Sequence, residues 1–182
     1  FLGLACASAS RPAPLQLLNG TTCLDGSRGG YYHRQALNDT FATRWVFSLE
    51  GGGECVSEDD CKSRTEGDLG SSDGWPATGD SFLFQFQEDD ASRNPDFYAW
   101  HHVFIKYCTG DLHLGTVQEP SEDQWGWAYF SGALIVDAVI ADLQESAHLN
   151  ESDLIVWSGD SAGGIGSAGT LDHVAKLLPD TT

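Results

Sequence analysis

A serine between glycines is the most reactive-looking group in this chain. Ser161 stands in the segment GDSAG (159–163), which follows a short apolar run at residues 154–157. A serine at a tight strand-to-helix turn, with glycine on both sides, has an exposed hydroxyl beside the N–H of the next residue. Acyl transfer needs both features. The pattern G-x-S-x-G therefore predicts a serine nucleophile, and the simplest alternative is a plain turn.

A second glycine-rich loop could supply groups that stabilise the negative charge of such a reaction. The sequence LEGGG (49–53) follows a predicted buried strand at residues 44–49. Where side chains are missing, backbone N–H groups can converge on a developing oxyanion. Two glycine loops in this order, each directly after a strand, favour acyl-transfer chemistry over two unrelated turns.

Two other interpretations of the serine segment fail on the surrounding residues. A phosphate-binding loop would carry a lysine that is missing here. The segment GDSAGG also resembles the GDSGGP of chymotrypsin-like peptidases, which have no helix after the serine and need an upstream histidine in a T-A-A-H-C-like setting. His101, His102 and His113 lie in no such setting. We therefore reject the peptidase interpretation, and the missing lysine counts against a phosphate-binding loop.

The elements that must position these loops are visible in the apolar pattern. Apolar residues at helical spacing predict a helix over residues 129–146, and a second helix is expected over 162–178. Residues 24–30 are typical of a turn between two early strands, and residues 54–94 of surface loops with short helical pieces. Further strands are predicted at 44–49, 102–107 and 154–157. This alternation predicts an α/β fold with a mostly parallel sheet and flanking helices.

Composition limits the partners. The 182 residues, 41% of them hydrophobic, can form one core, so we expect one domain or part of one. A formal net charge of −18 excludes binding to nucleic acid or anionic membranes, and no internal apolar run approaches membrane-spanning length. The acidic runs 58–60 and 88–90 fit no calcium loop and are predicted to be solvated surface. We expect no metal and no cofactor.

The first residues indicate export. The segment FLGLACASAS resembles the end of a secretory signal, so residues 1–9 are predicted to be its remnant and 20–182 part of a single domain. The chain contains no methionine, so the front of the signal is expected to be missing. Asn19, Asn38 and Asn150 begin glycosylation triplets. A secreted protein, extracellular or in a cell wall, is therefore expected.

Four cysteines remain once Cys6 in the predicted signal is set aside. Cys23, Cys55, Cys61 and Cys108 allow three pairings. A Cys55–Cys61 bond would close a small loop and leave Cys23 with Cys108. Free thiols or a metal site are the alternatives, although no histidine stands at zinc-ligand spacing to either pair.

Six linked motifs resemble the pectin acetylesterase family, which also contains the animal Notum carboxylesterases. They cover nearly the whole chain after the signal: CLDGS (23–27), LEGGGEC (49–55), GSS (70–72), NPDFYAW (94–100), IKYCTGD (105–111) and GDSAGG (159–164). The resemblance implies an α/β-hydrolase-like fold with Ser161 as nucleophile. It implies backbone oxyanion donors at Gly52, Gly53 and Ala162, and the disulfides Cys23–Cys108 and Cys55–Cys61.

Two departures from the family pattern concern the substrate. Notum-like members carry a tryptophan after the glycine pair, where this chain has Gly53, as plant and microbial members do. That difference favours a sugar O-acetyl ester over a fatty acyl group. Many plant members have a tryptophan where Glu54 stands, so the pocket wall is expected to differ.

The third departure concerns the rest of the catalytic triad, which in α/β-hydrolases follows the serine in the order acid, then histidine. Only 21 residues follow Ser161. Asp172 and His173 fall on the same predicted helix, about three turns and roughly 16 Å along its axis from Ser161, so His173 is too far away to act as its base. We therefore expect the chain to be the N-terminal half of the enzyme, lacking the triad acid and base and inactive alone.

The sequence thus predicts part of a secreted serine ester hydrolase that removes O-acetyl groups from a cell-wall polysaccharide such as pectin. A Notum-like protein deacylase is one alternative. An inactive secreted carbohydrate-binding or interaction protein is the other. Because pectin is anionic and the chain carries a charge of −18, a neutral acetylated polysaccharide is a further alternative as substrate.

Overall fold

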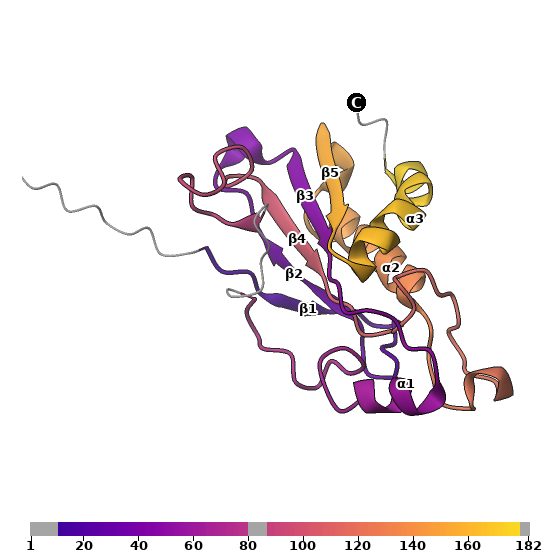
Figure 1. Cartoon of the computed structure of the whole chain (residues 1–182). Helices are drawn as coiled ribbons and strands as arrows, with labels where there is room; N and C mark the ends of the chain where they lie inside the picture. Colours follow the sequence, from indigo (N-terminus) through magenta and orange to yellow (C-terminus); the bar gives the residue numbers. More distant parts are fainter. Residues whose placement is uncertain (1–10, 80–86, 179–182) are drawn as a thin grey trace, which may run out of the picture.

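A five-stranded sheet forms the centre of the molecule (Figure 1). The computed structural model describes residues 11–79 and 87–178, so the predicted signal remnant at residues 1–9 lies outside the described residues. The sheet order is β1-β2-β4-β3-β5. The strands are β1 (Leu15–Leu17), β2 (Gly30–Arg34), β3 (Arg44–Leu49), β4 (His101–Ile105) and β5 (Leu154–Gly159).

Strand direction divides the sheet in two. β3 runs parallel to both of its neighbours, β4 and β5. β1 and β2 form an antiparallel hairpin, and β2 pairs antiparallel with β4. The α/β expectation is confirmed. The described sheet is mixed rather than mostly parallel, because the early hairpin joins it in the antiparallel sense.

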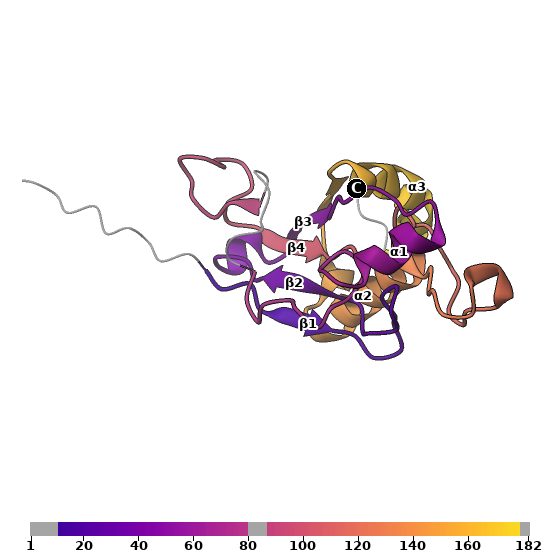
Figure 2. The same cartoon turned by 60° about the horizontal axis from the view of Figure 1, so that its bottom comes forward.

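Helices cover one face of the sheet. The helices are α1 (Glu58–Arg64), α2 (Gly132–Ser146) and α3 (Ala162–Leu177), with short 3-10 turns η1 (Asp39–Phe41), η3 (Glu122–Gln124) and η4 (Leu149–Glu151). α2 and α3 pack together on the same side of the strands, as two views show (Figures 1 and 2). Over residues 11–79 and 87–178, no helix combines the length and apolar character needed to cross a membrane.

The main core lies between this helical pair and the sheet. Alternate strand residues point to one face, so Tyr31, Phe47 and Ile105 meet the apolar stripe of α2. Ile135 and Val139 supply that stripe and are essentially inaccessible to solvent. Full burial of such a side chain contributes about 1.5–3 kcal/mol, so the α2 stripe fixes the helix against the strands.

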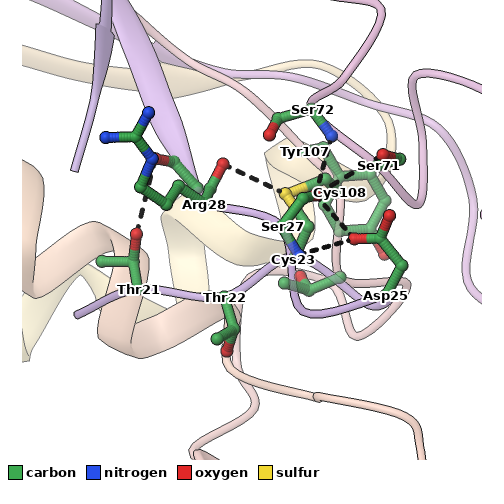
Figure 3. The surroundings of a disulfide bond; sticks show 12 residues. Thr21, Thr22, Cys23, Asp25, Ser27, Arg28, Ser71, Ser72, Tyr107 and Cys108 are labelled. Carbon is green, nitrogen blue, oxygen red and sulfur yellow. Dashed lines mark hydrogen bonds between the residues drawn. A yellow bond between two sulfur atoms is a disulfide. The ribbon is translucent and has the colours of Figure 1, made fainter. Parts of the chain in front are cut away.

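Two disulfides are present, in the pairing that the resemblance implied. Cys55–Cys61 spans 6 residues and closes the start of α1, while Cys23–Cys108 spans 85 and joins the loop before β2 to the end of β4. Around the second bond, the hydroxyl of Ser27 donates to Asp25 and accepts from the N–H of Ser72 (Figure 3). The Cys23–Cys108 disulfide and these hydrogen bonds together hold three loops at the end of the sheet where β3 and β4 finish.

Three buried histidines occupy the opposite end of the strands. His101 donates to the carbonyl of Ala42, so its Nδ1 must accept from His33 Nε2 at 2.9 Å. His102 Nε2 donates to the Phe97 carbonyl at 2.8 Å. These roles require neutral rings. Burial lowers the pKa of His33 to about 3, and burial lowers the pKa of His101 and of His102 to about 4.

Acid should destabilise the fold through these rings. Above about pH 6.5 the folded and unfolded chains both hold neutral histidines. Between about pH 6.5 and 4 only the unfolded chain takes up the protons, so the free energy of unfolding falls as pH falls. His102→Gln keeps one donor and one acceptor but cannot charge. We expect this variant to lose less stability than the wild type between about pH 7.5 and 4.5, measured by urea unfolding.

The exposed His148 provides the matched control, and asparagine tolerates its left-handed backbone, φ 59°. His148→Asn should show the wild-type pH dependence. An equal loss in His102→Gln and wild type would show that the buried histidines do not control acid stability.

Candidate active site

The two glycine loops leave the sheet side by side. β3 and β5 are parallel neighbours in the register Leu49↔Gly159, so both strands end at the same level. The N–H of Asp160 donates to the carbonyl of Leu49 at 3.2 Å, which extends this pairing one residue into the turn. The loop 50–53 and the serine segment therefore start from adjacent points on one edge.

Ser161 occupies the strand-to-helix turn that its sequence predicts. It is exposed and directly precedes the first residue of α3. Its backbone, φ 51° and ψ −118°, lies in a region that residues other than glycine rarely adopt. Such strain persists only where the surroundings enforce it, and it is common at active sites.

Close backbone packing enforces this turn. A Cβ on Gly163 would lie 2.0 Å from the Leu49 carbonyl oxygen, and a Cβ on Gly159 would lie 2.1 Å from that of Gly163. A Cβ on Gly51 would lie 3.1 Å from that of Ser161. The glycines are therefore required by contact between β3, β5 and α3, and Gly51, at the start of the loop 51–53, lies against the serine.

The predicted oxyanion donors are oriented by their neighbours. The carbonyl of Gly52 accepts from Arg64 Nη1 at 2.9 Å. Because C=O and N–H point in opposite directions across a trans peptide, the N–H of Gly53 points away from Arg64. No side chain caps the start of α3, so the N–H of Ala162 belongs to a helix N-terminus suited to an anion. The oxyanion role of Gly52, Gly53 and Ala162 stays a prediction.

A buried ion pair anchors the glycine loop. Glu50 Oε1 accepts from Lys106 Nζ at 2.6 Å, and Oε2 accepts from the N–H of Tyr107 at 2.8 Å. Burial raises the pKa of Glu50, while Lys106 and the Tyr107 N–H act against that rise. The pair ties the residue after β3 to the residue after β4. Sequence reasoning missed it, although a glutamate and a lysine directly after apolar strands were the available signal.

A buried histidine supports the same loop from the other side. His113 Nε2 lies 2.9 Å from the carbonyl oxygen of Glu50, and its ring stacks on Tyr107 with 4.6 Å between centroids. Burial lowers the pKa of His113, which favours a neutral ring that donates to this carbonyl. With its Nε2 used in this way, His113 is a structural support of the loop.

None of the chain's six histidines forms a hydrogen bond with Ser161 among the described residues. His173 Nε2 lies 2.6 Å from Asp137 on the solvent side of α2 and α3. His148 faces Glu151, and the remaining three lie at the opposite end of the sheet. The part of the chain that the structure describes thus holds the serine and its loop without a partner base.

Other predicted sites are located but untested. Asn19, Asn38 and Asn150 are all exposed, which leaves them accessible to glycosylation. Asn38 also accepts from the N–H of Thr40 at the start of η1. Across residues 11–79 and 87–178, no three His, Cys, Asp or Glu side chains are grouped as metal ligands would be.

The mixed sheet, the serine turn and the adjacent glycine loop define an α/β-hydrolase-like protein. The family model described as pectinacetylesterase matches residues 9–182. This chain belongs to the pectinacetylesterase family.

Relatives of two named activities share this similarity. The zebrafish (Danio rerio) palmitoleoyl-protein carboxylesterase notum1a is 36% identical over 163 residues, which is 87% of this chain and 30% of that protein. Arabidopsis thaliana pectin acetylesterase 4 is 31% identical over 160 residues, covering 88% of this chain and 38% of that protein. The chain thus spans about a third of the length of these curated relatives.

A solved structure agrees with the fold. The Drosophila Wnt deacylase Notum superposes with a TM-score of 0.81 at 32% identity. The match covers 92% of this chain and 48% of that one. The arrangement described above is therefore that of roughly half of the Notum chain.

The glycine contacts predict that alanine substitutions at two neighbouring positions of α3 differ strongly in their effect on stability. Gly163→Ala should lower the free energy of unfolding by more than about 2 kcal/mol, because its Cβ would strike the Leu49 backbone. Gly164→Ala, whose Cβ meets only Gly159 at 3.3 Å, should stay within about 1 kcal/mol of wild type. Thermal unfolding of both proteins measures this. Equal stabilities would refute the packing argument.

The ion pair that anchors the glycine loop predicts non-additive losses of stability when its two residues are substituted. Glu50→Gln and Lys106→Met should each cost about 3–5 kcal/mol, since each removes one charge of a buried ion pair. The double variant should be more stable than the sum of the single losses implies. A urea-unfolding double-mutant cycle gives the coupling energy. Additive losses would mean that the pair does not act as one unit.

Proposed function

We propose that this chain carries the nucleophile and the oxyanion loop of a serine carboxylic-ester hydrolase. The observation that supports this most directly is the contact between Gly51 and the strained Ser161 at the ends of two parallel strands. Relatives named as a carboxylesterase and an acetylesterase support the same reaction class.

The proposed reaction is acyl transfer in two steps. A base from outside the described residues takes the proton of Ser161, and Oγ attacks the ester carbonyl carbon. The N–H groups of Gly52, Gly53 and Ala162 donate to the oxyanion. Its collapse breaks the bond to the alcohol, which leaves with the proton from the base. Water then attacks the acyl-enzyme and releases the carboxylic acid and free Ser161, without a cofactor.

The substrate that we propose is an O-acetylated polysaccharide. Gly53 adds no side chain to the loop that begins beside the serine, and its backbone at φ 72° disfavours one. A small acetyl group needs no deep pocket in the loop. The similarity to Arabidopsis pectin acetylesterase 4 supports this choice. The slightly higher identity to palmitoleoyl-protein carboxylesterases supports a second candidate, removal of a fatty acyl group from a protein.

We further propose that the protein is secreted. Two disulfides fit an oxidising compartment, and both close loops around the candidate site. The three glycosylation triplets place their asparagines on the exposed surface. These features support an extracellular or cell-wall location.

Removal of the serine hydroxyl should abolish turnover. In the protein made from its full coding sequence, Ser161→Ala should reduce hydrolysis of p-nitrophenyl acetate by at least about a thousandfold and leave the unfolding curve unchanged. Ser167→Ala, in the same helix with its hydroxyl on the Gly164 carbonyl, should keep full activity. Turnover in Ser161→Ala would refute the assignment of the nucleophile.

The same full-length protein can be used to identify the substrate. Faster release of acetate from acetylated polysaccharide than of palmitoleate from an acylated peptide supports the first candidate, and the reverse supports the second. Residues 1–182 expressed alone should show no Ser161-dependent turnover, since none of their histidines serves Ser161. Rapid turnover by that chain would place the base within it. A full-length protein without esterase activity would favour an interaction protein.

A further inference from the structure

Three aromatic side chains, of which one is exposed and two are half-buried, form a cluster outside the candidate active site. Trp125, Trp127 and Phe130, here the aromatic platform, lie in the loop between β4 and α2. The rings of Trp125 and Trp127 are stacked, with centroids 6.1 Å apart and an interplanar angle of 26°. Trp125 meets Phe130 edge-on at 6.1 Å and is 39% exposed. The cluster thus presents the ring of Trp125 to solvent, supported by two half-buried rings.

Local structure holds this platform in place. The hydroxyl of Ser121 accepts from the N–H of Asp123, and the Gln124 side chain accepts from the N–H of Ser121. These reciprocal hydrogen bonds form a capping box at the start of η3. Trp125 follows with a left-handed backbone, φ 56°. Trp127 Nε1 donates to Glu58 Oε1 at 3.2 Å. The rings are therefore preorganised, so little side-chain entropy would be lost when a ligand binds to them.

Helix α1 connects the platform to the candidate active site. Glu58, at its first turn, contacts Trp127, and Arg64, at its last, holds the carbonyls of Gly52 and Glu54 at 2.9 Å. The rise between Glu58 and Arg64 is about 9 Å. Two views show η3, the short orange-brown helix, beside α1 (Figures 1 and 2). Helix α1 therefore joins the platform to the loop that carries Gly52.

The charges around the platform select among such ligands. Glu58, Glu122 and Asp123 flank the rings and are acidic. Lys62 is paired with Glu58 at 2.7 Å while its Nζ lies 5.9 Å from the Trp127 ring centre. Uronic acids and nucleic acid are repelled here. A sugar ring without charge has an apolar C–H face that fits the negative face of an indole.

We propose that the aromatic platform is a subsite for neutral sugar units of an O-acetylated polysaccharide, with Trp125 as the stacking residue. The proposal deepens the proposed function and rests on it for the reaction. It narrows the substrate from pectin, which is anionic, to an uncharged acetylated backbone. Sugar units bound at Trp125 would anchor the polysaccharide one short helix away from the loop that carries Gly52.

Binding can be measured without turnover. The protein would be run in native gels that contain acetylated glucomannan, acetylated xylan without uronic-acid branches, or polygalacturonate, at low salt and at about 0.5 M salt. We expect retardation by the neutral polymers alone. Trp125→Asn, which suits a left-handed backbone, should weaken binding by about tenfold or more. Trp125→Tyr keeps an aromatic face and should retain most of it.

A control and the contrary outcomes separate this proposal from the proposed function. Leu37→Ala removes an apolar side chain that is more exposed than Trp125, at 49%, from the opposite end of the sheet and should bind as wild type. Wild-type binding by Trp125→Asn would overturn the subsite, and tighter binding of polygalacturonate would overturn its preference for neutral sugars. Loss of esterase activity in Ser161→Ala with gel retardation unchanged is expected. Sugar binding by an enzyme that hydrolyses no ester would refute only the proposed reaction.

Discussion

The parallel pairing of β3 with β5 is the constraint on which the site depends. Hydrogen bonds between parallel strands fix where the two chains finish relative to one another. Here Leu49 pairs with Gly159, so the residues that follow are brought together whatever their side chains are. A shift by one residue would turn every side chain of β5 to the other face and separate Ser161 from the glycine loop. The core beneath α2 and α3 resists that shift.

The two ends of the sheet are packed by different kinds of contact. At the end that carries Ser161, side chains are omitted so that backbone can touch backbone, as at Gly163. The Glu50–Lys106 ion pair then anchors the loop to the end of β4. At the other end, three neutral histidines fill the space with rings whose nitrogen atoms have assigned roles. One end is therefore sensitive to added volume and the other to added protons.

Periodicity and motif spacing predicted most of this architecture. The strand at 44–49 and the helix beginning at Ala162 are found where expected, because a glycine turn marks each boundary. The helix predicted from residue 129 begins at Gly132, since the N–H of Tyr129 donates to the Leu24 carbonyl and Phe130 packs against the cluster that contains Leu24. The Ser161 turn was predictable from its glycines. The Glu50–Lys106 contact was not, because it joins residues 56 apart that only the sheet order brings together.

The Cys23–Cys108 bond gives the two halves of the site unequal mechanical protection. It encloses β2, β3, α1 and β4 in a covalent ring that includes the glycine loop, whereas β5, Ser161 and α3 follow outside it. Force or proteolysis acting from the C-terminal side would meet only hydrogen bonds and packing as it removes α3 and β5. The ring would stay closed. Local opening of this kind would separate the serine from its loop long before the chain unfolds as a whole, and reclosure could restore the site without new disulfide chemistry.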